Sequence, residues 1–336
     1  IFVMSISALY LLRGKHRDIA RRSIAVAASF GLASALSVVV LGDESGYAAT
    51  EHQKMKLAAM EAMWHTEPAP AGFNLFAIPG DQVNSWQIQV PFALGLIATR
   101  SLDGEIPGIL DLVQLAGQRI ENGLVAYQAL QDIRADGTNE AARQTFSENW
   151  GDLGYALLLK RYREDVVNAT DEEITQAAFD TVPGVAPLFW SFRIMVGLGV
   201  LMLGLGLWSL VLRWRGRLYE APLMHRAAVL MGPAGFVAVL AGWVTTEVGR
   251  QPWTVYGLLT TAESASAIDA AAVGTSLVAF ILVYFALFGA GLFYILRLMA
   301  EAPHAHEPGL PPEKPIRAAG IMPAPAMEQA GALPAE

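Results

Sequence analysis

The chain has 336 residues, of which 54% are hydrophobic and 16% are charged, and its formal net charge is −8. A soluble domain usually carries about a quarter charged residues, and a nucleic-acid-binding protein is usually basic, so this composition argues against both classes. The absence of cysteine excludes disulfides, thiolate metal sites and covalently attached c-type haem.

The chain opens with two apolar segments. Ile1–Leu12 is too short to span a membrane, and we expect it to be the end of a helix that begins outside this chain. Ile24–Leu41 carries no charge over roughly 27 Å of helix, at about 1.5 Å per residue, which is enough to cross a membrane. Residues 1–41 are therefore predicted to contain the end of one transmembrane helix, a basic connection and one full transmembrane helix.

A long connection follows, which we predict to be a mostly helical loop over residues 42–187. Lys54–Trp64 and Asp111–Arg134 show the features of helices, and Thr170 with Glu173 forms a capping box that opens another. Three prolines between the first two helices predict an irregular segment there: Pro68, Pro70 and Pro79.

Three further apolar runs lie within residues 188–299 and predict three transmembrane helices: Ile194–Leu212, Ala227–Val244 with Pro233 inside it, and Ala270–Leu296. One such run could be the buried helix of a soluble protein, but four in one chain argue against it. The predicted fold is thus an all-α integral membrane protein with one partial plus four full transmembrane helices. Residues 300–336, rich in Pro and Ala, are expected to be a disordered tail.

Basic residues indicate the orientation, because Lys and Arg near span ends favour the cytoplasm. The clusters lie at residues 13–22, at residues 213–226 and at Arg297, and counting the spans puts all three on one side. We expect that side, and the tail, to be cytoplasmic. The large loop, which is richer in acidic residues, is then periplasmic.

Glu247 and Arg250 lie near the end of the third full run, with Trp243 and Trp253 close by in the sequence. Charges at membrane depth are costly and usually functional, so the pair could be a carboxylate metal ligand beside a cation that binds an anionic group. Aromatic and charged residues also form ordinary interfacial belts at helix ends. The residues alone favour neither interpretation.

Arg193 begins the second full run, and Met195 lies two residues inside it. A methionine in an apolar helix is core packing far more often than an iron ligand, although the nearby cation would suit a haem propionate. The histidines all lie in connections or in the tail: His16, His52, His65, His225, His304 and His306. A haem within the membrane would therefore need histidine ligands from outside this chain.

Lys56 and Glu61 lie five residues apart on the predicted helix Lys54–Trp64, which sets them about 140° apart around its axis. They do not form a same-face ion pair. Solvated charges on a loop helix are the commoner situation.

Several of these stretches form an ordered series. Gly242-Trp243 followed by Glu247–Trp253 is one, and Phe192–Met195 is another. The loop adds Leu41–Tyr47, Gln53–Glu61, Pro68–Pro70 and Ala156–Tyr162. Together they resemble subunit I, the large haem-bearing subunit, of cytochrome bd-type ubiquinol oxidases, in the branch with a long quinol loop. The resemblance runs from Ile1 to about Arg297, and it identifies the chain as a C-terminal fragment.

The resemblance implies roles for individual residues. Met195 would ligate the iron of a low-spin haem b and Glu247 that of a high-spin haem b. Arg193, Trp243 and Arg250 would belong to the haem surroundings. Lys56 and Glu61 would act in quinol oxidation, with the histidine ligands, including that of haem d, preceding this chain.

The implied function is that of a terminal respiratory oxidase in the bacterial inner membrane. Quinol, either ubiquinol or menaquinol, would be oxidised at the periplasmic loop. Electrons would pass through the haems b to haem d, where O₂ is reduced to water, and a proton gradient would form without pumping. The implied partners are subunit II and a small single-span subunit, and this fragment alone is expected to be inactive. The alternative is a secondary transporter or scaffold subunit that uses Glu247 and Arg250.

Overall fold

The computed structural model describes residues 1–101 and 103–300, and most of them are helical. The helices are α1 (Phe2–Arg13), α2 (Arg17–His52), α3 (Lys54–Met60), α4 (Ile109–Ala135), α5 (Glu140–Asn149), α6 (Leu153–Ala156), α7 (Asp171–Phe179), α8 (Val185–Trp214), α9 (Pro222–Leu230), α10 (Ala234–Arg250) and α11 (Ala270–Ala300). The strands form two antiparallel hairpins, β1 (Phe73–Pro79) with β2 (Asn84–Val90) and β3 (Trp253–Val255) with β4 (Leu259–Thr260). The predicted tail falls outside the described residues, apart from residue 300.

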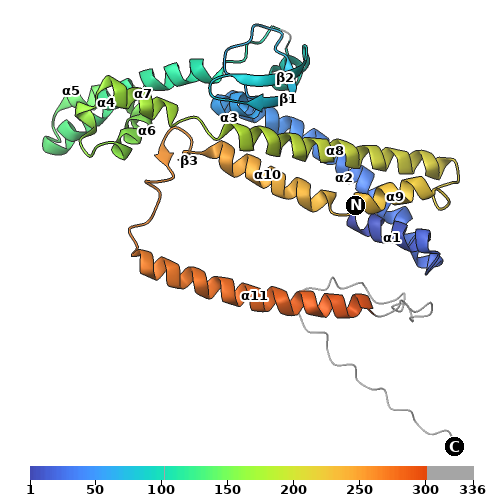
Figure 1. Cartoon of the computed structure of the whole chain (residues 1–336). Coiled ribbons are helices and arrows are strands. Elements are labelled where there is room, and N and C mark those ends of the chain that lie inside the picture. The colour runs from blue at the N-terminus through green and yellow to red at the C-terminus, as the bar shows by residue number, and fades with distance from the viewer. Residues whose placement is uncertain (102, 301–336) are drawn as a thin grey trace, which may run out of the picture. The chain divides into compact units, whose positions relative to one another are not determined.

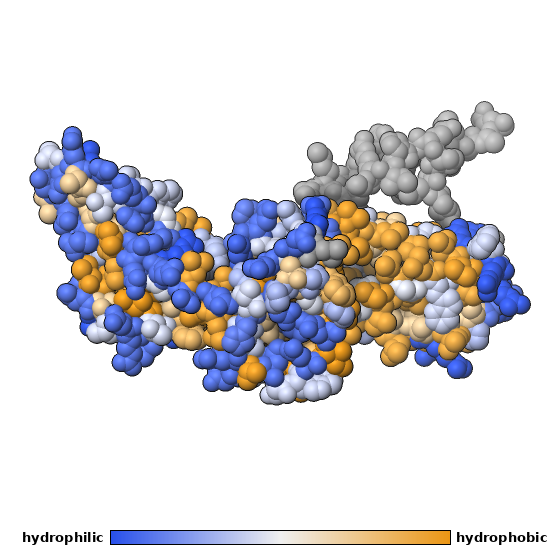
Figure 2. All heavy atoms as spheres, turned by 90° about the horizontal axis from the view of Figure 1, so that it is seen from above, coloured by the Kyte–Doolittle hydropathy of each residue, from blue (hydrophilic) through white to orange (hydrophobic). Residues whose placement is uncertain are grey.

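Four segments within the described residues are long and apolar enough to cross a membrane: Arg17–His52, Val185–Trp214, Pro222–Arg250 and Ala270–Leu298. In lipid, a helix is the only open structure that pairs every backbone N–H and C=O internally, so a long uncharged run predicts a helix reliably. The predicted all-α membrane fold is confirmed (Figure 1). Figure 2 shows apolar residues gathered along the long helices, while hydrophilic residues cover much of α4–α7.

Among its described residues the first unit, residues 1–268, contains a small hydrophobic cluster at Ala62, Ala77 and Phe189 and two larger cores. One is formed where α1, α2, α8 and α9 pack together, with Met4, Ile24 and Met224 fully buried. The other lies in the connection between α2 and α8, hereafter the large connection, and it includes residues from α3, α4 and α7. The large connection is therefore a folded structure packed on the ends of the long helices. α11 belongs to the second unit.

Two of the apolar runs depart from their predicted limits. α2 continues past Leu41 to His52, and in this extension Arg100 forms ion pairs at 2.9 Å with Asp43 and 2.8 Å with Glu44. The run Ala227–Val244 is interrupted: α9 ends at Leu230 and α10 begins at Ala234. Pro233 stands at this break, because proline has no N–H for a helical hydrogen bond and clashes with the preceding turn.

The large connection holds the main correction to the predicted secondary structure. The stretch expected to be irregular contains the hairpin β1–β2, in which Phe76 faces Ile88 and Ile78 faces Trp86. The alternation of Trp86, Ile88 and Val90 with polar residues is a strand signal that the proline pattern concealed. By contrast, α4 confirms the helix predicted over 111–134, and α7 begins at the predicted capping box of Thr170 and Glu173.

Candidate functional site

α3 lies against the ends of α8 and α10 nearest the large connection; it carries Lys56, and Glu61 follows directly after it. It begins at Lys54 and ends at Met60, short of the predicted Trp64, and Ala62 then adopts a positive φ of 50°. Its apolar residues are buried, including Met55, Ala58 and Ala59. Because α3 is packed on several sides, its polar side chains must find partners within the fold.

Glu61, directly after α3, forms a buried ion pair with Arg193 of α8. The distance from Glu61 Oε2 to Arg193 Nη2 is 2.6 Å, and the two side chains are 2% and 10% exposed. Arg193 Nη1 also donates to the carbonyl of Met60 at 2.6 Å. The aromatic rings of Phe73 and Phe189 flank the guanidinium, at 4.7 and 4.1 Å from its carbon. Glu61 is therefore not an exposed loop carboxylate but half of an interior ion pair.

Burial raises the pKa of the Glu61 carboxyl, and the nearby Glu67 acts in the same direction. Arg193 and the backbone N–H of Asn74 lower the pKa without fully offsetting the burial. A carboxyl whose pKa is raised binds a proton more readily, which suits a general base.

Lys56 has different neighbours, the Glu247–Arg250 pair of α10. Burial lowers the pKa of the Lys56 ammonium; Arg250 adds to this effect and Glu247 opposes it. The lysine packs on the backbone of α10 at Gly249, where a Cβ would lie only 2.9 Å from Lys56 Cε. A larger residue at 249 would displace the lysine, so the glycine permits this close approach.

The predicted residues thus fall into two groups on either side of α3. Glu61 joins Arg193, two residues before Met195, whereas Lys56 lies near Glu247 and Arg250, which form a salt bridge. The structure gives the two loop residues separate partners.

Met195 lies at the contact between α8 and α10. Its Sδ is 2.9 Å from the position that a Cβ on Gly242 would occupy, so the thioether fills the space above this glycine. One helical turn away, Ser191 and Thr245 join the same two helices through their hydroxyls at 2.9 Å. Trp243, next to Gly242, is 64% exposed and extends away from this contact.

The donor atoms on α8 and α10 suit haem iron in their chemistry. A thioether and a carboxylate can each supply one axial ligand, and Met195 and Glu247 are both partly exposed. Arg250 is available beside Glu247, whereas a propionate at Arg193 would have to share the guanidinium with Glu61. No group of three or more His, Asp or Glu side chains that could hold a metal ion occurs in residues 1–101 and 103–300.

The buried histidine of α9 is not a free iron ligand in this arrangement. His225 is 3% exposed, and its Nε2 lies 2.8 Å from the carbonyl oxygen of Leu218. In this arrangement Nε2 of His225 is already bonded, so this nitrogen is not open to a metal.

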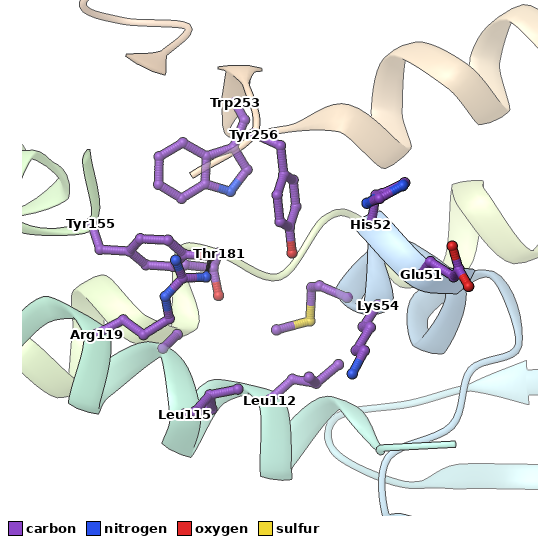
Figure 3. A pocket seen from close by; sticks show the side chains of 12 residues that line it. Glu51, His52, Lys54, Leu112, Leu115, Arg119, Tyr155, Thr181, Trp253 and Tyr256 are labelled. Atoms are coloured by element: carbon purple, nitrogen blue, oxygen red, sulfur yellow. Dashed lines mark hydrogen bonds between the residues drawn. The ribbon is translucent and has the colours of Figure 1, made fainter. Parts of the chain in front are cut away.

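A cavity of about 250 Å³ adjoins the first residues of α3 (Figure 3). Trp253 and Tyr256 line it from the β3–β4 hairpin, and Leu112 and Arg119 line it from α4. Arg119 is fixed by Asp152 at 2.6 Å and by the hydroxyl of Tyr155 at 2.9 Å. Neither Lys56 nor Glu61 lines this cavity, so it is separate from the two groups described above.

Sequence reasoning missed one buried polar residue of the site, Asn74 of β1. It is 1% exposed and donates from Nδ2 to the backbone carbonyl of Glu61 at 2.7 Å. An asparagine in a proline-flanked stretch carries no signal of burial, and only the hairpin brings it to α3.

The fold and this site define a mainly helical, multi-pass membrane protein in which a thioether and a carboxylate lie on neighbouring helices. The family model described as cytochrome bd terminal oxidase subunit I matches residues 1–303. The chain therefore belongs to the cytochrome bd terminal oxidase subunit I family, which confirms the resemblance found in the sequence.

Relatives agree with this assignment. The chain is 39% identical over 286 residues to the cytochrome bd-II ubiquinol oxidase subunit 1 of Escherichia coli, covering 84% of this chain and 56% of that protein. It is 29% identical over 299 residues to the cytochrome bd ubiquinol oxidase subunit 1 of Bacillus subtilis, covering 88% of this chain and 52% of that protein. This chain thus spans about half the length of these relatives.

The solved bd oxidase from Geobacillus thermodenitrificans has the same fold. The TM-score is 0.58 at 22% identity, and the match covers 90% of this chain and 54% of that one.

Proposed function

We propose that this chain forms part of subunit I of a quinol oxidase in the bacterial inner membrane. Quinol would be oxidised at the large connection, on the periplasmic side. Electrons would pass through haems b to haem d, where O₂ is reduced to water, and the membrane would be charged without a pump. Membership of the family supports this proposal, as do the two relatives, which are ubiquinol oxidase subunits by name.

The observation that carries the proposal is the position of α3. Glu61, directly after α3, contacts Arg193 of α8. Lys56 of α3 lies near Glu247 and Arg250 of α10. These are the two helices that bear the proposed iron ligands. A substrate oxidised beside α3 would therefore lie near both ligand segments. Glu61 is buried and Lys56 is partly buried, so neither faces open solvent as an ordinary loop charge would.

Glu61, Lys56 and Arg193 would each have a separate role in quinol oxidation. Glu61 would accept a proton from a quinol hydroxyl as a general base. Lys56 would stabilise the developing phenolate with its ammonium group. Arg193 would hold Glu61 in place and keep the loop in contact with α8.

Met195 would ligate the iron of the low-spin haem b, and Glu247 that of the high-spin haem b. Arg193, Trp243 and Arg250 would contact the haem surroundings. When bound, the haems would supply the one-electron acceptors and the iron at which O₂ is reduced. The second axial ligands would come from other parts of the oxidase.

The proposed function also assigns a place to each part of the chain. Residues 1–41 and 188–299 would form the membrane part, residues 42–187 the periplasmic quinol-binding loop, and the basic clusters would face the cytoplasm. Subunit II and a small single-span subunit would complete the complex. The substrate would be ubiquinol or menaquinol.

The experiment uses the full-length subunit in its complex. Reduced-minus-oxidised spectra should show haem bands, and a colourless protein would contradict the proposal and favour a transporter or scaffold. Lys56→Ala and Glu61→Ala should lower quinol-dependent O₂ uptake while the spectrum and the rate from an artificial donor remain normal. Lys54→Ala is the matched control, because Lys54 is an exposed lysine on the same helix. Parental quinol kinetics in both test variants would show that quinol is oxidised elsewhere.

A further inference from the structure

Asn74 bonds both partners of the buried ion pair. Its Nδ2 donates to the backbone carbonyl of Glu61 at 2.7 Å. Its own backbone carbonyl accepts from Arg193, at 3.1 Å from Nε and 2.5 Å from Nη2. One position on β1 therefore fixes the backbone that carries the carboxylate and the guanidinium that faces it.

The second oxygen of this residue is unpaired. Asn74 Oδ1 is buried and has no hydrogen-bond partner within the part of the chain that the structure describes. Reversing the amide would not help, because Oδ1 would then face the carbonyl of Glu61, and two acceptors cannot bond. A buried acceptor without a donor is destabilising, so its retention calls for a reason.

We propose that Asn74 is a positioning residue of the quinol-oxidation site. It holds Glu61 and Arg193 in one arrangement, and it offers Oδ1 as an acceptor when Glu61 receives a proton. The inference rests on the function proposed above. Oxidation of one quinol to quinone releases two protons and two electrons; the Glu61 carboxylate would take one proton, water at the outer surface would take the other, and the bound haems would supply the electron acceptors.

Few charged groups surround Glu61, so the pKa of its carboxyl is sensitive to a charge introduced at residue 74. Arg193 faces it from α8, and Glu67 acts from the segment before β1. Asn74 contributes its backbone N–H from β1. The rings of Phe73, Phe189 and Phe192 around Arg193 carry no charge. A new carboxylate at residue 74 would therefore be felt directly by Glu61.

Asn84 provides a matched control on the neighbouring strand. Its Nδ2 donates to the backbone carbonyl of Ala62 at 2.9 Å, and its Oδ1 accepts from Trp64 at 3.2 Å. Asn84 thus ties the hairpin to the segment after α3, as Asn74 does, but bonds neither Glu61 nor Arg193. A variant at this position loosens the hairpin without changing the contacts of the ion pair.

The test compares Asn74→Asp, Asn84→Asp and the parent in the full-length complex. Quinol-dependent O₂ uptake is measured against pH, together with the rate from an artificial donor and the haem spectrum. In Asn74→Asp the like charge should raise the pKa of Glu61, so the acid limb of kcat should move to higher pH. A rise of about one unit lowers kcat on that limb about tenfold. KM for quinol, the artificial-donor rate and the spectrum should stay close to parental, and Asn84→Asp should keep the parental pH profile.

A parental pH profile in Asn74→Asp overturns the inference, and so does an equal shift in Asn84→Asp, which would indicate loosening of the hairpin alone. If Asn74→Asp does not assemble, Asn74→Ser takes its place. Lower quinol-driven kcat with a normal artificial-donor rate supports the role, and parental kcat contradicts it. A parent without haem bands or quinol oxidation would refute the proposed function itself, which is a distinguishable failure.

Discussion

Breaking the Glu61–Arg193 pair should destabilise the junction between the large connection and α8, and the two ways of breaking it should not be equal. Glu61→Ala leaves Arg193 with carbonyl partners only, at Met60 and Asn74. Arg193→Ala removes those bonds as well and also the contacts with the flanking aromatic rings. The double variant removes both charges together.

The expected magnitudes follow from burial. Removing one partner of a buried ion pair typically costs about 3–5 kcal/mol, because an uncompensated charge remains, and at 2% and 10% exposure neither side chain is screened by water. Arg193→Ala should lie toward the upper end, since each lost cation–π contact adds about 0.5–1 kcal/mol. The double variant should cost less than the sum of the single variants, by about 0.5–3 kcal/mol.

The assay is thermal inactivation of the full-length complex in lipid nanodiscs. Large membrane proteins usually unfold irreversibly, so half-lives at one temperature are compared rather than equilibrium free energies. Glu61→Ala should shorten the half-life, Arg193→Ala should shorten it further, and the double variant should be longer-lived than additivity predicts. Lys54→Ala should leave the half-life unchanged, because Lys54 is exposed.

Two results would refute this reasoning. Half-lives that combine additively in the double variant would mean that the two charges do not interact. A parental half-life in Glu61→Ala would mean that the bonds of Arg193 to backbone carbonyls suffice to stabilise the junction.

Three further predictions concern the proposed ligands and the topology. Met195→Leu nearly conserves volume and apolarity, so packing should change little, while the low-spin haem b signal should be lost or become high-spin with the haem d band retained; an unchanged spectrum would return Met195 to a packing role. Glu247→Gln keeps the shape and removes the charge, and it should disturb the high-spin haem b and largely abolish quinol-dependent O₂ uptake; normal activity would make Glu247 an interface residue. Cysteines placed at Gly137 and Gly216 should differ in intact cells, where an impermeant thiol reagent should label only residue 137; labelling at residue 216 alone would reverse the orientation.

The limits of the sequence reasoning show most clearly at α2 and at the break before α10. The uncharged run ends at Leu41, so hydropathy alone places the end of the helix there, yet α2 continues to His52, and Asp43 and Glu44 of this extension pair with Arg100, far along the chain. At Pro233 the predicted membrane span is present, but the helix within it is interrupted. A hydropathy average is not sensitive to a single proline. The backbone is, because proline cannot continue the helical hydrogen bonds, and the run divides into two helices.

For the candidate site, too, the sequence identifies single residues and the tertiary structure determines how they pair. Glu247 stood out in the sequence as a carboxylate at the end of an apolar run, whereas Met195, Lys56 and Glu61 were singled out by the family resemblance. The sequence did not predict how these residues group in space, because helical spacing describes only residues on the same helix. The pairing of Glu61 with a residue 132 positions later depends on how α3 docks against α8.

The sequence by itself determined that this chain crosses a membrane with long helices, since in lipid an uncharged run of that length has one stable backbone structure. It also determined the family, through short motifs in a fixed order. Only the tertiary structure decided that the hairpin brings Asn74 to the end of α3, that Arg193 turns toward the loop, and that Lys56 lies beside Glu247 and Arg250. The physical reason is that buried charges and polar groups are stabilised by partners distant in sequence, and folding alone determines which partners they meet.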